Sequence, residues 1–241
     1  MRARSDRQRL RPRRFYASVT IAGEHAPFEI HLDGKALRTP LKSPLELSSR
    51  RLAQALAAEW QAQGQKIDAS AMPLTRLANT AIDRVNPNRS RIIDEIVKFA
   101  GSDLVCYRAS APERLRERQA AAWDDVLVWA HRVLDADLAT ASGIVFRDQP
   151  PGALAAIRAH LVPKPSWELA ALHSLTTLTG SALLALMVAA GAKTGEAAWS
   201  AAHVDEDWQI EHWGVDAEAQ ARRAAHRREF DAALTFLALL G

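Results

Sequence analysis

The amino-acid sequence predicts an α+β protein, with a mixed β/α N-terminal domain followed by an all-helical C-terminal domain. Apolar side chains alternate with polar ones in two early runs, residues 15–21 and 28–32, as they do in half-buried strands. From Ser48 onward they recur at helical spacing, and after Pro112 nearly every segment has that spacing. Strands grouped before helices are typical of the α+β class. We therefore expect an Arg-rich disordered tail at 1–13, the mixed domain at 14–110 and the helical domain at 111–241.

The predicted strands are punctuated by turn residues. Asp33-Gly34 between two apolar runs favours a tight hairpin turn into residues 35–37. Thr39-Pro40 then ends the hairpin, because proline has no N–H to donate to a sheet. The run from Asp103 to Tyr107 predicts a further short strand that returns to the first sheet.

The predicted helices are bounded by capping residues and prolines. Ser48 or Ser49 is a suitable N-cap for the first, and Thr194 and Asp216 for two of the last. The apolar run 167–190 predicts either one helix or two. We expect helices over residues 49–64, from 73, from 90, over 115–134, 153–161, 167–190, 194–213 and 216–240.

The positive charge of the chain is concentrated at its start. Seven arginines and one aspartate give residues 1–14 a net charge of +6; because the whole chain carries +3, the remainder carries −3. A mildly acidic body does not favour a nucleic-acid-binding domain. The tail itself is open to two readings, a solvated disordered arm or an arm that contacts RNA or a membrane.

The remaining composition indicates a globular protein of the bacterial cytoplasm, or of the mitochondrial matrix if the source is eukaryotic. Hydrophobic residues make up 48% and charged residues 24% of the 241, and the single cysteine, Cys106, forms no internal disulfide. No secretory signal is visible. The uncharged stretch 169–192 is long enough to span a bilayer, but its hydroxyl side chains, His173 and Gly180 favour buried helices instead.

Catalytic motifs are absent from the sequence. It contains no phosphate-binding GxxxxGK[ST], and neither GxGxxG, GxSxG nor HExxH. Cys106 lies in an apolar run without a base nearby, so we expect it to be structural. We predict no catalytic residue, no cofactor and no metal, and therefore not an enzyme.

The strongest alternative chemistry lies near the C-terminus. His203, Asp207 and Glu211 share one helical face, with Glu206 beside them, and such a set could serve a metal-dependent enzyme. Di-iron bundles, however, use Glu-x-x-His pairs on two helices, and here the order is reversed without a second copy. A second alternative is a nucleic-acid-binding protein that uses the Arg-rich tail.

Tryptophans and acids are interleaved in the same segment, DEDWQIEHWG, residues 205–214. Aromatic side chains surrounded by charge are typical of interface hot spots. The residues alone leave Trp213 equally open to a contact role and to packing at a helix end. They leave Glu206 open to a role as a solvated charge or as the partner of a nearby base on the same helix.

Seven segments, read together, identify the chain as a member of a known family. It resembles the assembly chaperones for the catalytic head of F-type ATP synthase that handle the alpha subunit. The matching segments, in the family's order, are Arg14-Phe15-Tyr16, LDGKALRTP (32–40), EWQAQ (59–63), MPLTRLANTAID (72–83), SDLVCYRA (102–109), TGSALLALMV (179–188) and DEDWQIEHWG.

The resemblance implies a partner rather than a substrate. The expected partner is the unassembled alpha subunit, bound by a chaperone that is monomeric when free, binds no nucleic acid and does not insert stably into a membrane. The family's functional acidic position matches Glu206, or less closely Asp205, and we expect it to contact a basic group, flanked by Gln209 and Trp213. Two other motif residues should support the fold: Trp60 as a buried anchor, and Arg76 as the partner of Asp83 or Glu59.

Overall fold

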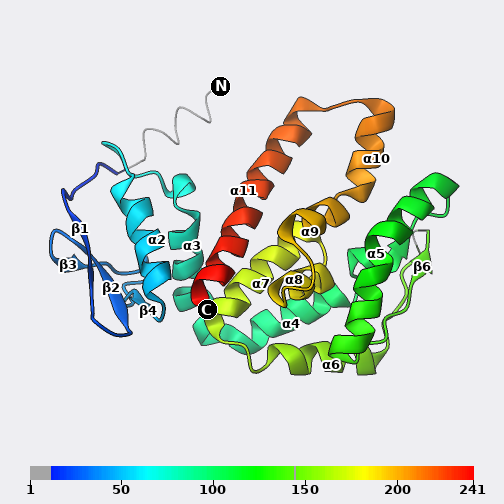
Figure 1. Cartoon of the computed structure of the whole chain (residues 1–241), viewed down its shortest axis with the longest axis horizontal. Helices are drawn as coiled ribbons and strands as arrows, with labels where there is room; N and C mark the ends of the chain where they lie inside the picture. Colours follow the sequence, from blue (N-terminus) through cyan, green and yellow to red (C-terminus); the bar gives the residue numbers. More distant parts are fainter. Residues whose placement is uncertain (1–11, 144) are drawn as a thin grey trace. The chain divides into compact units, whose positions relative to one another are not determined.

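The computed structural model describes residues 12–143 and 145–241 (Figure 1). Its contacts divide the chain into two compact units, Met1–Pro87 with Thr235–Gly241, and Asn88–Leu234. These units come from contacts within the chain, and the domain boundary that the sequence predicts at 110/111 stays a prediction. The predicted tail lies outside the described residues up to residue 11. Its last residue, Arg13, forms a bridge with Lys66.

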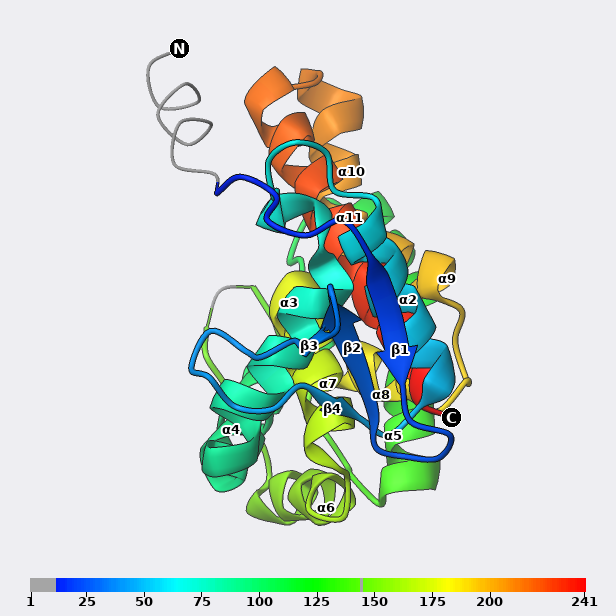
Figure 2. The ribbon, with the colours of Figure 1, turned by 90° about the vertical axis from the view of Figure 1, so that its left-hand side faces the viewer.

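The first unit contains a small antiparallel sheet, seen from the side in Figure 2. Strand β2 (Phe28–Leu32) lies between β1 (Val19–Ala22) and β3 (Lys35–Ala36), and it also pairs with β4 (Glu46–Leu47). Burial alternates along β2, as the period-two pattern predicted. The hairpin turn is also confirmed: Asp33 and Gly34 have φ of 48° and 78°, the left-handed conformations of the tightest hairpin turns.

Helices pack on this sheet and beside it. Helix α2 (Arg50–Gln61) contacts β1 and β2, and Ser49 caps it by accepting a hydrogen bond from Leu52 N at 3.3 Å, as predicted. Helix α3 (Pro73–Thr80) begins with proline at its first position, where an N–H has no helical partner in any case. Short helical turns complete this part of the unit, η1 (Ala69–Ala71), η2 (Ala81–Val85, a π-helical turn) and η3 (Asn86–Asn88).

The second unit is mainly helical, as the sequence predicted. The segments before and after helix α5 pair with each other as a short parallel two-stranded sheet. The elements are α4 (Arg89–Ala100), η4 (Leu104–Cys106), β5 (Tyr107–Arg108), α5 (Glu113–Leu134), β6 (Ala141–Ser142), α6 (Pro151–Leu161), α7 (Ser166–Thr179), α8 (Ala182–Ala189), α9 (Gly195–Ala202), α10 (Val204–Trp213) and α11 (Ala217–Leu240). The residues of α11 from Thr235 belong to the first unit.

The apolar run 167–190 forms two helices, α7 and α8. Gly180 separates them with a φ of 69°, and Ser181 caps α8 by accepting from Leu184 N at 3.0 Å. Residues 182–187 are all buried, so α8 is the centre of the unit's core. Across the described residues, no helix combines the length and apolar character needed to cross a bilayer.

Two sequence predictions are wrong here. The run 103–107 is not a strand of the first sheet: Asp103 caps the turn η4 by accepting from Val105 N, and only Tyr107 and Arg108 continue into β5, which pairs with β6 in a separate sheet. The predicted helix 194–213 is interrupted at His203, whose φ and ψ of −118° and 17° are not helical. Its predicted N-cap is confirmed, because Thr194 accepts from Ala197 N at 3.2 Å.

Candidate functional site

The candidate site is built on α10 and the turn that follows it, between α10 and α11. Three acids, Asp205, Glu206 and Asp207, occupy the first turn of α10, where negative charge favours the helix dipole. The helix ends at Gly214, whose φ of 84° suits glycine and whose N–H donates to Ile210 O at 2.9 Å. None of its side chains is buried, so contacts at its surface must hold it in place.

Asp205 and Glu211 attach α10 to α5. Gln119, which is buried, donates from Nε2 to Asp205 Oδ1 at 2.7 Å. Arg118 donates to both carboxylate oxygens of Glu211, at 2.8 and 2.9 Å. Bidentate arginine–carboxylate pairs fix orientation as well as distance. These two acids therefore have a positioning role within the unit, and a partner contact by Asp205 stays a prediction.

The other two acids face α11. Arg223 of that helix donates to Asp207, whereas its Nε lies 3.8 Å from Glu206. The other neighbour of Glu206, His203 Nε2, is 3.9 Å away. Both distances exceed hydrogen-bonding range, and the Glu206 side chain is 55% exposed. Of the four acids on α10, Glu206 is the one whose carboxylate is most available to another molecule.

The His203 side chain is buried, and its contacts are internal. Its Nδ1 lies 2.7 Å from Trp199 O, so this nitrogen carries the proton and donates it. The imidazole lies against the Trp199 indole with centroids 4.0 Å apart, and burial lowers the pKa of His203. Within the described ranges, no group of three or more His, Cys, Asp or Glu side chains is placed to hold a metal ion. The alternative of a metal-dependent enzyme on His203 and Glu206 therefore gains no support from this geometry.

Trp213 is not a core residue. Its side chain is 78% exposed, and Val215 in the following turn is 59% exposed. Trp208, one helical turn earlier, is only partly exposed, because its indole stacks on His212 at 4.2 Å between centroids and the Arg118 guanidinium lies over it. The two tryptophans of the motif thus differ: Trp208 is fixed by neighbours, and Trp213 is presented to solvent.

Of the surface hollows beside α10, two are lined by both Gln209 and Trp213. The larger, about 750 Å³, lies between α10 and α11 and includes Glu206. The smaller, about 410 Å³, lies toward the segment that joins β5 to α5 and includes Asp205. The four predicted site residues therefore border one continuous surface. Its other lining residues include Ile210, Val215, Ala219 and Arg223 in the larger hollow, and Tyr107, Pro112, Leu115 and Trp208 in the smaller.

Sequence reasoning missed several of these residues. Val215 had a weak signal, since an apolar residue directly after a helix-ending glycine is exposed unless another element covers it. Arg118 and Gln119 had none, because they precede their partners on α10 by 93 and 86 residues.

Cys106 is buried, as the sequence predicted. Burial, together with the nearby charge of Asp103, raises the pKa of the Cys106 thiol to about 12. Because the thiolate is the reactive form of cysteine, this thiol is unsuited to nucleophilic chemistry.

In the first unit, the segments that resemble the chaperone family contact one another. Glu59 accepts from Leu74 N and Thr75 N, both at 2.8 Å, and so caps α3 from outside. Burial raises the pKa of Glu59, whereas the hydrogen bonds from Thr75 and Leu74 and the charge of Arg76 lower it. The role of Arg76 as the partner of Glu59 or Asp83 stays a prediction. Asp83 instead binds the loop 39–41, accepting from Thr39 Oγ1 at 2.7 Å. Trp60, predicted to be buried, is partly exposed, and its carbonyl accepts from the Tyr16 hydroxyl at 2.7 Å.

An exposed tryptophan beside an available carboxylate, at the border of two surface hollows, is typical of the surfaces of protein-binding proteins. Comparison with known proteins gives the family. The model of the ATP12 chaperone protein family matches residues 13–131. The crystal structure of Atp12 from Paracoccus denitrificans is 40% identical, has a TM-score of 0.90, and is matched over 99% of its length and 95% of this chain. A mutant of P. denitrificans Atp12p gives the same identity and TM-score, with 98% of its chain matched.

The Atu1473 protein of Agrobacterium tumefaciens is also similar, at 47% identity with a TM-score of 0.91 over 87% of its chain and 95% of this one. The chain belongs to the ATP12 chaperone family. It is an assembly chaperone for ATP synthase and not an enzyme, as the sequence motifs predicted.

Proposed function

We propose that this chaperone binds the unassembled alpha subunit of F-type ATP synthase and shields its subunit interface until the beta subunit docks. The observation that carries the proposal is the surface around α10, where Trp213 and Val215 are exposed beside the available carboxylate of Glu206. A large exposed aromatic side chain next to a charge is the composition of an interface hot spot. Single exposed apolar residues are common, but here they border two hollows that side chains of a partner can enter.

In this proposal Glu206 contacts a basic group of the alpha subunit. Gln209 and Trp213 line the same hollow as Glu206, and Asp205 holds α10 in place through Gln119. Docking a basic group against Glu206 would replace its distant neighbours, Arg223 and His203, with a close ion pair.

Binding alone is sufficient for such a cycle. An unassembled ring subunit exposes an interface of the large, apolar kind that obligate complexes bury, and such surfaces aggregate. A protein that covers the surface reversibly lowers the concentration of the exposed form by mass action. The beta subunit then displaces the chaperone by burying more area. We place this cycle in the bacterial cytoplasm, or in the mitochondrial matrix if the source is eukaryotic, with a chaperone that is monomeric when free.

The test is co-expression with the alpha subunit of the same organism, followed by affinity purification. The wild-type chaperone should give a soluble complex. Glu206→Lys should weaken that complex at least about tenfold, because a basic group then faces a like charge. Circular dichroism should be unchanged, since the Glu206 side chain is exposed and makes no short contact.

The matched control is Asp137→Lys, a charge reversal at a side chain that is 80% exposed. Asp137 follows the C-terminal end of α5, about 20 Å along the helix axis from the Gln119 contact. The control should bind as the wild type does. Equal loss in both variants would indicate a general charge effect and contradict the role of Glu206, and the absence of any wild-type complex would refute the function itself.

A further inference from the structure

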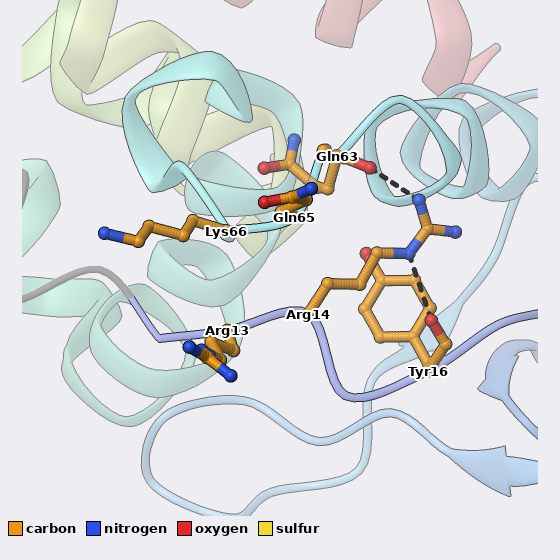
Figure 3. Close-up of a pocket in the computed structure, with 7 residues that line it drawn as sticks. Arg13, Arg14, Tyr16, Gln63, Gln65 and Lys66 are labelled. Carbon is orange, nitrogen blue, oxygen red and sulfur yellow. Dashed lines mark hydrogen bonds between the residues drawn. The ribbon is translucent and has the colours of Figure 1, made fainter.

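A second surface lies at the N-terminal edge of the first unit, in a hollow lined by residues 13, 14, 16 and 63–66 (Figure 3). Residues 12–14 pair there with residues 65–67 in an antiparallel arrangement. Arg14 N donates to Gln65 O at 3.0 Å, and Ile67 N donates to Pro12 O at 2.9 Å. These two bonds flank Arg13 and Lys66, so the pair is of the non-hydrogen-bonded type, in which side chains share one face and approach most closely.

The pairing opposes two positive charges. Like charges directly opposite each other in an antiparallel pair destabilise it. Both Arg13 and Lys66 are exposed. Natural sequences break such local rules mainly at sites where function requires it. The cationic pair therefore indicates a surface shaped for an anion.

The neighbouring arginine has a different role. The Arg14 guanidinium donates to the carbonyls of Gln63 and Tyr16, and its carbon lies 4.6 Å from the centre of the Tyr16 ring. Figure 3 shows this guanidinium directed toward Gln63 and Tyr16, away from the side chains of Arg13 and Lys66. Arg14 thus fixes the edge of the fold, and Arg13 and Lys66 supply its outward charge.

The surroundings add to the positive potential. Among the described residues that line the hollow, three are cations and none carries a carboxylate. The sequence up to residue 14 has a net charge of +6.

An exposed aromatic side chain accompanies the charges. Phe15 is 70% exposed and contacts the Tyr16 ring edge-on at 5.4 Å. It lies two residues after Arg13, close enough along the chain for both side chains to reach one flat surface. Basic side chains beside an exposed Phe are the combination that contacts a bilayer interface, with the cations at the headgroups and the ring at the acyl boundary.

We propose that this edge, formed by Arg13, Phe15 and Lys66, binds the phosphate headgroups of an anionic lipid surface. Nucleic acid also offers phosphates, but the net charge of −3 on the rest of the chain opposes an extended polyanion. A lipid surface needs contact at one edge only. This contact is peripheral, and its residues are distinct from those of the α10 surface.

The test is co-sedimentation of the full chain with vesicles of phosphatidylcholine alone or with about one third phosphatidylglycerol. The wild type should bind the anionic vesicles and lose that binding as salt rises toward roughly physiological strength. The double variant R13Q/K66Q should partition roughly tenfold to thirtyfold more weakly. Its circular dichroism should match that of the wild type, because both side chains are exposed. Phe15→Ser should give a smaller loss.

The matched control is K35Q/K42Q, which removes two exposed lysines of the same unit outside the hollow. It should bind nearly as the wild type does. Equal binding to neutral vesicles, equal loss in both double variants, or no loss in R13Q/K66Q would each overturn the proposal. Single-stranded RNA that displaces the protein from vesicles at matched phosphate would overturn it in favour of nucleic acid, and inorganic phosphate that does so beyond its ionic strength would indicate a free-phosphate site.

Discussion

Helices α8 and α10 of the second unit are similar in length and opposite in environment. Residues 182–187 of α8 are buried on all sides, whereas α10 has no buried residue. The first helix is stabilised by removal of apolar area from water. The second is held by Gln119 and Arg118 of α5 and by Arg223 of α11, through side-chain contacts at its surface. In this unit, α8 therefore contributes to stability and α10 is available for recognition.

The largest effect on stability is expected for a substitution in the core of α8. Leu184 is fully buried, and Leu184→Ala should lower the free energy of unfolding by about 2–5 kcal/mol, the range for large-to-small core substitutions. Chemical denaturation checks this value. A loss below about 1 kcal/mol would mean that α8 is not the centre of the core.

The second test concerns the carboxylate that caps α8. Asp103 accepts from Leu183 N at 3.1 Å, and burial raises its pKa from 3.8 to about 6. Between those two values the folded state holds the proton more tightly than the unfolded state, so stability falls as pH rises. Relative to Asp103→Asn, the wild type should lose stability as pH rises from about 4 to about 6 and level off above that. Denaturation curves of both proteins at several pH values measure the difference, and parallel pH profiles would contradict the buried-acid interpretation.

The smallest effect on stability is expected at Trp213. Because its side chain is 78% exposed, Trp213→Ser should change the free energy of unfolding by less than about 0.5 kcal/mol. The same variant should weaken the proposed alpha-subunit complex, which pull-down against the wild type measures. Loss of stability comparable with that of Leu184→Ala would show that Trp213 is a packing residue and would remove the contrast between the two helices.

The sequence predicted the features that depend on neighbouring residues. The Asp33-Gly34 hairpin and the caps at Ser49 and Thr194 are encoded within a few positions, and the structure confirms them. The predicted strand at 103–107 failed for the opposite reason. Its apolar residues are buried by helices of the second unit rather than by a sheet, a distinction that periodicity in five residues cannot make.

The candidate site shows the same division. The sequence placed Glu206, Gln209 and Trp213 on one segment, and the structure adds that Glu206 and Trp213 are accessible. The contacts that the other acids of α10 make with neighbouring helices could not be predicted from the sequence. Arg118 contacts Glu211 and Arg223 contacts Asp207 only because the fold brings their helices together. No fixed spacing along the chain relates an arginine to a carboxylate on another helix.

The position of Trp213 between two hollows has a consequence for cooperativity. One indole forms part of the wall of both, so its rotamer determines how much room each offers. A side chain of a partner that enters either hollow therefore contacts the same indole. If one occupant repositions the ring, it would change the affinity for the other, and by thermodynamic linkage that effect would be reciprocal.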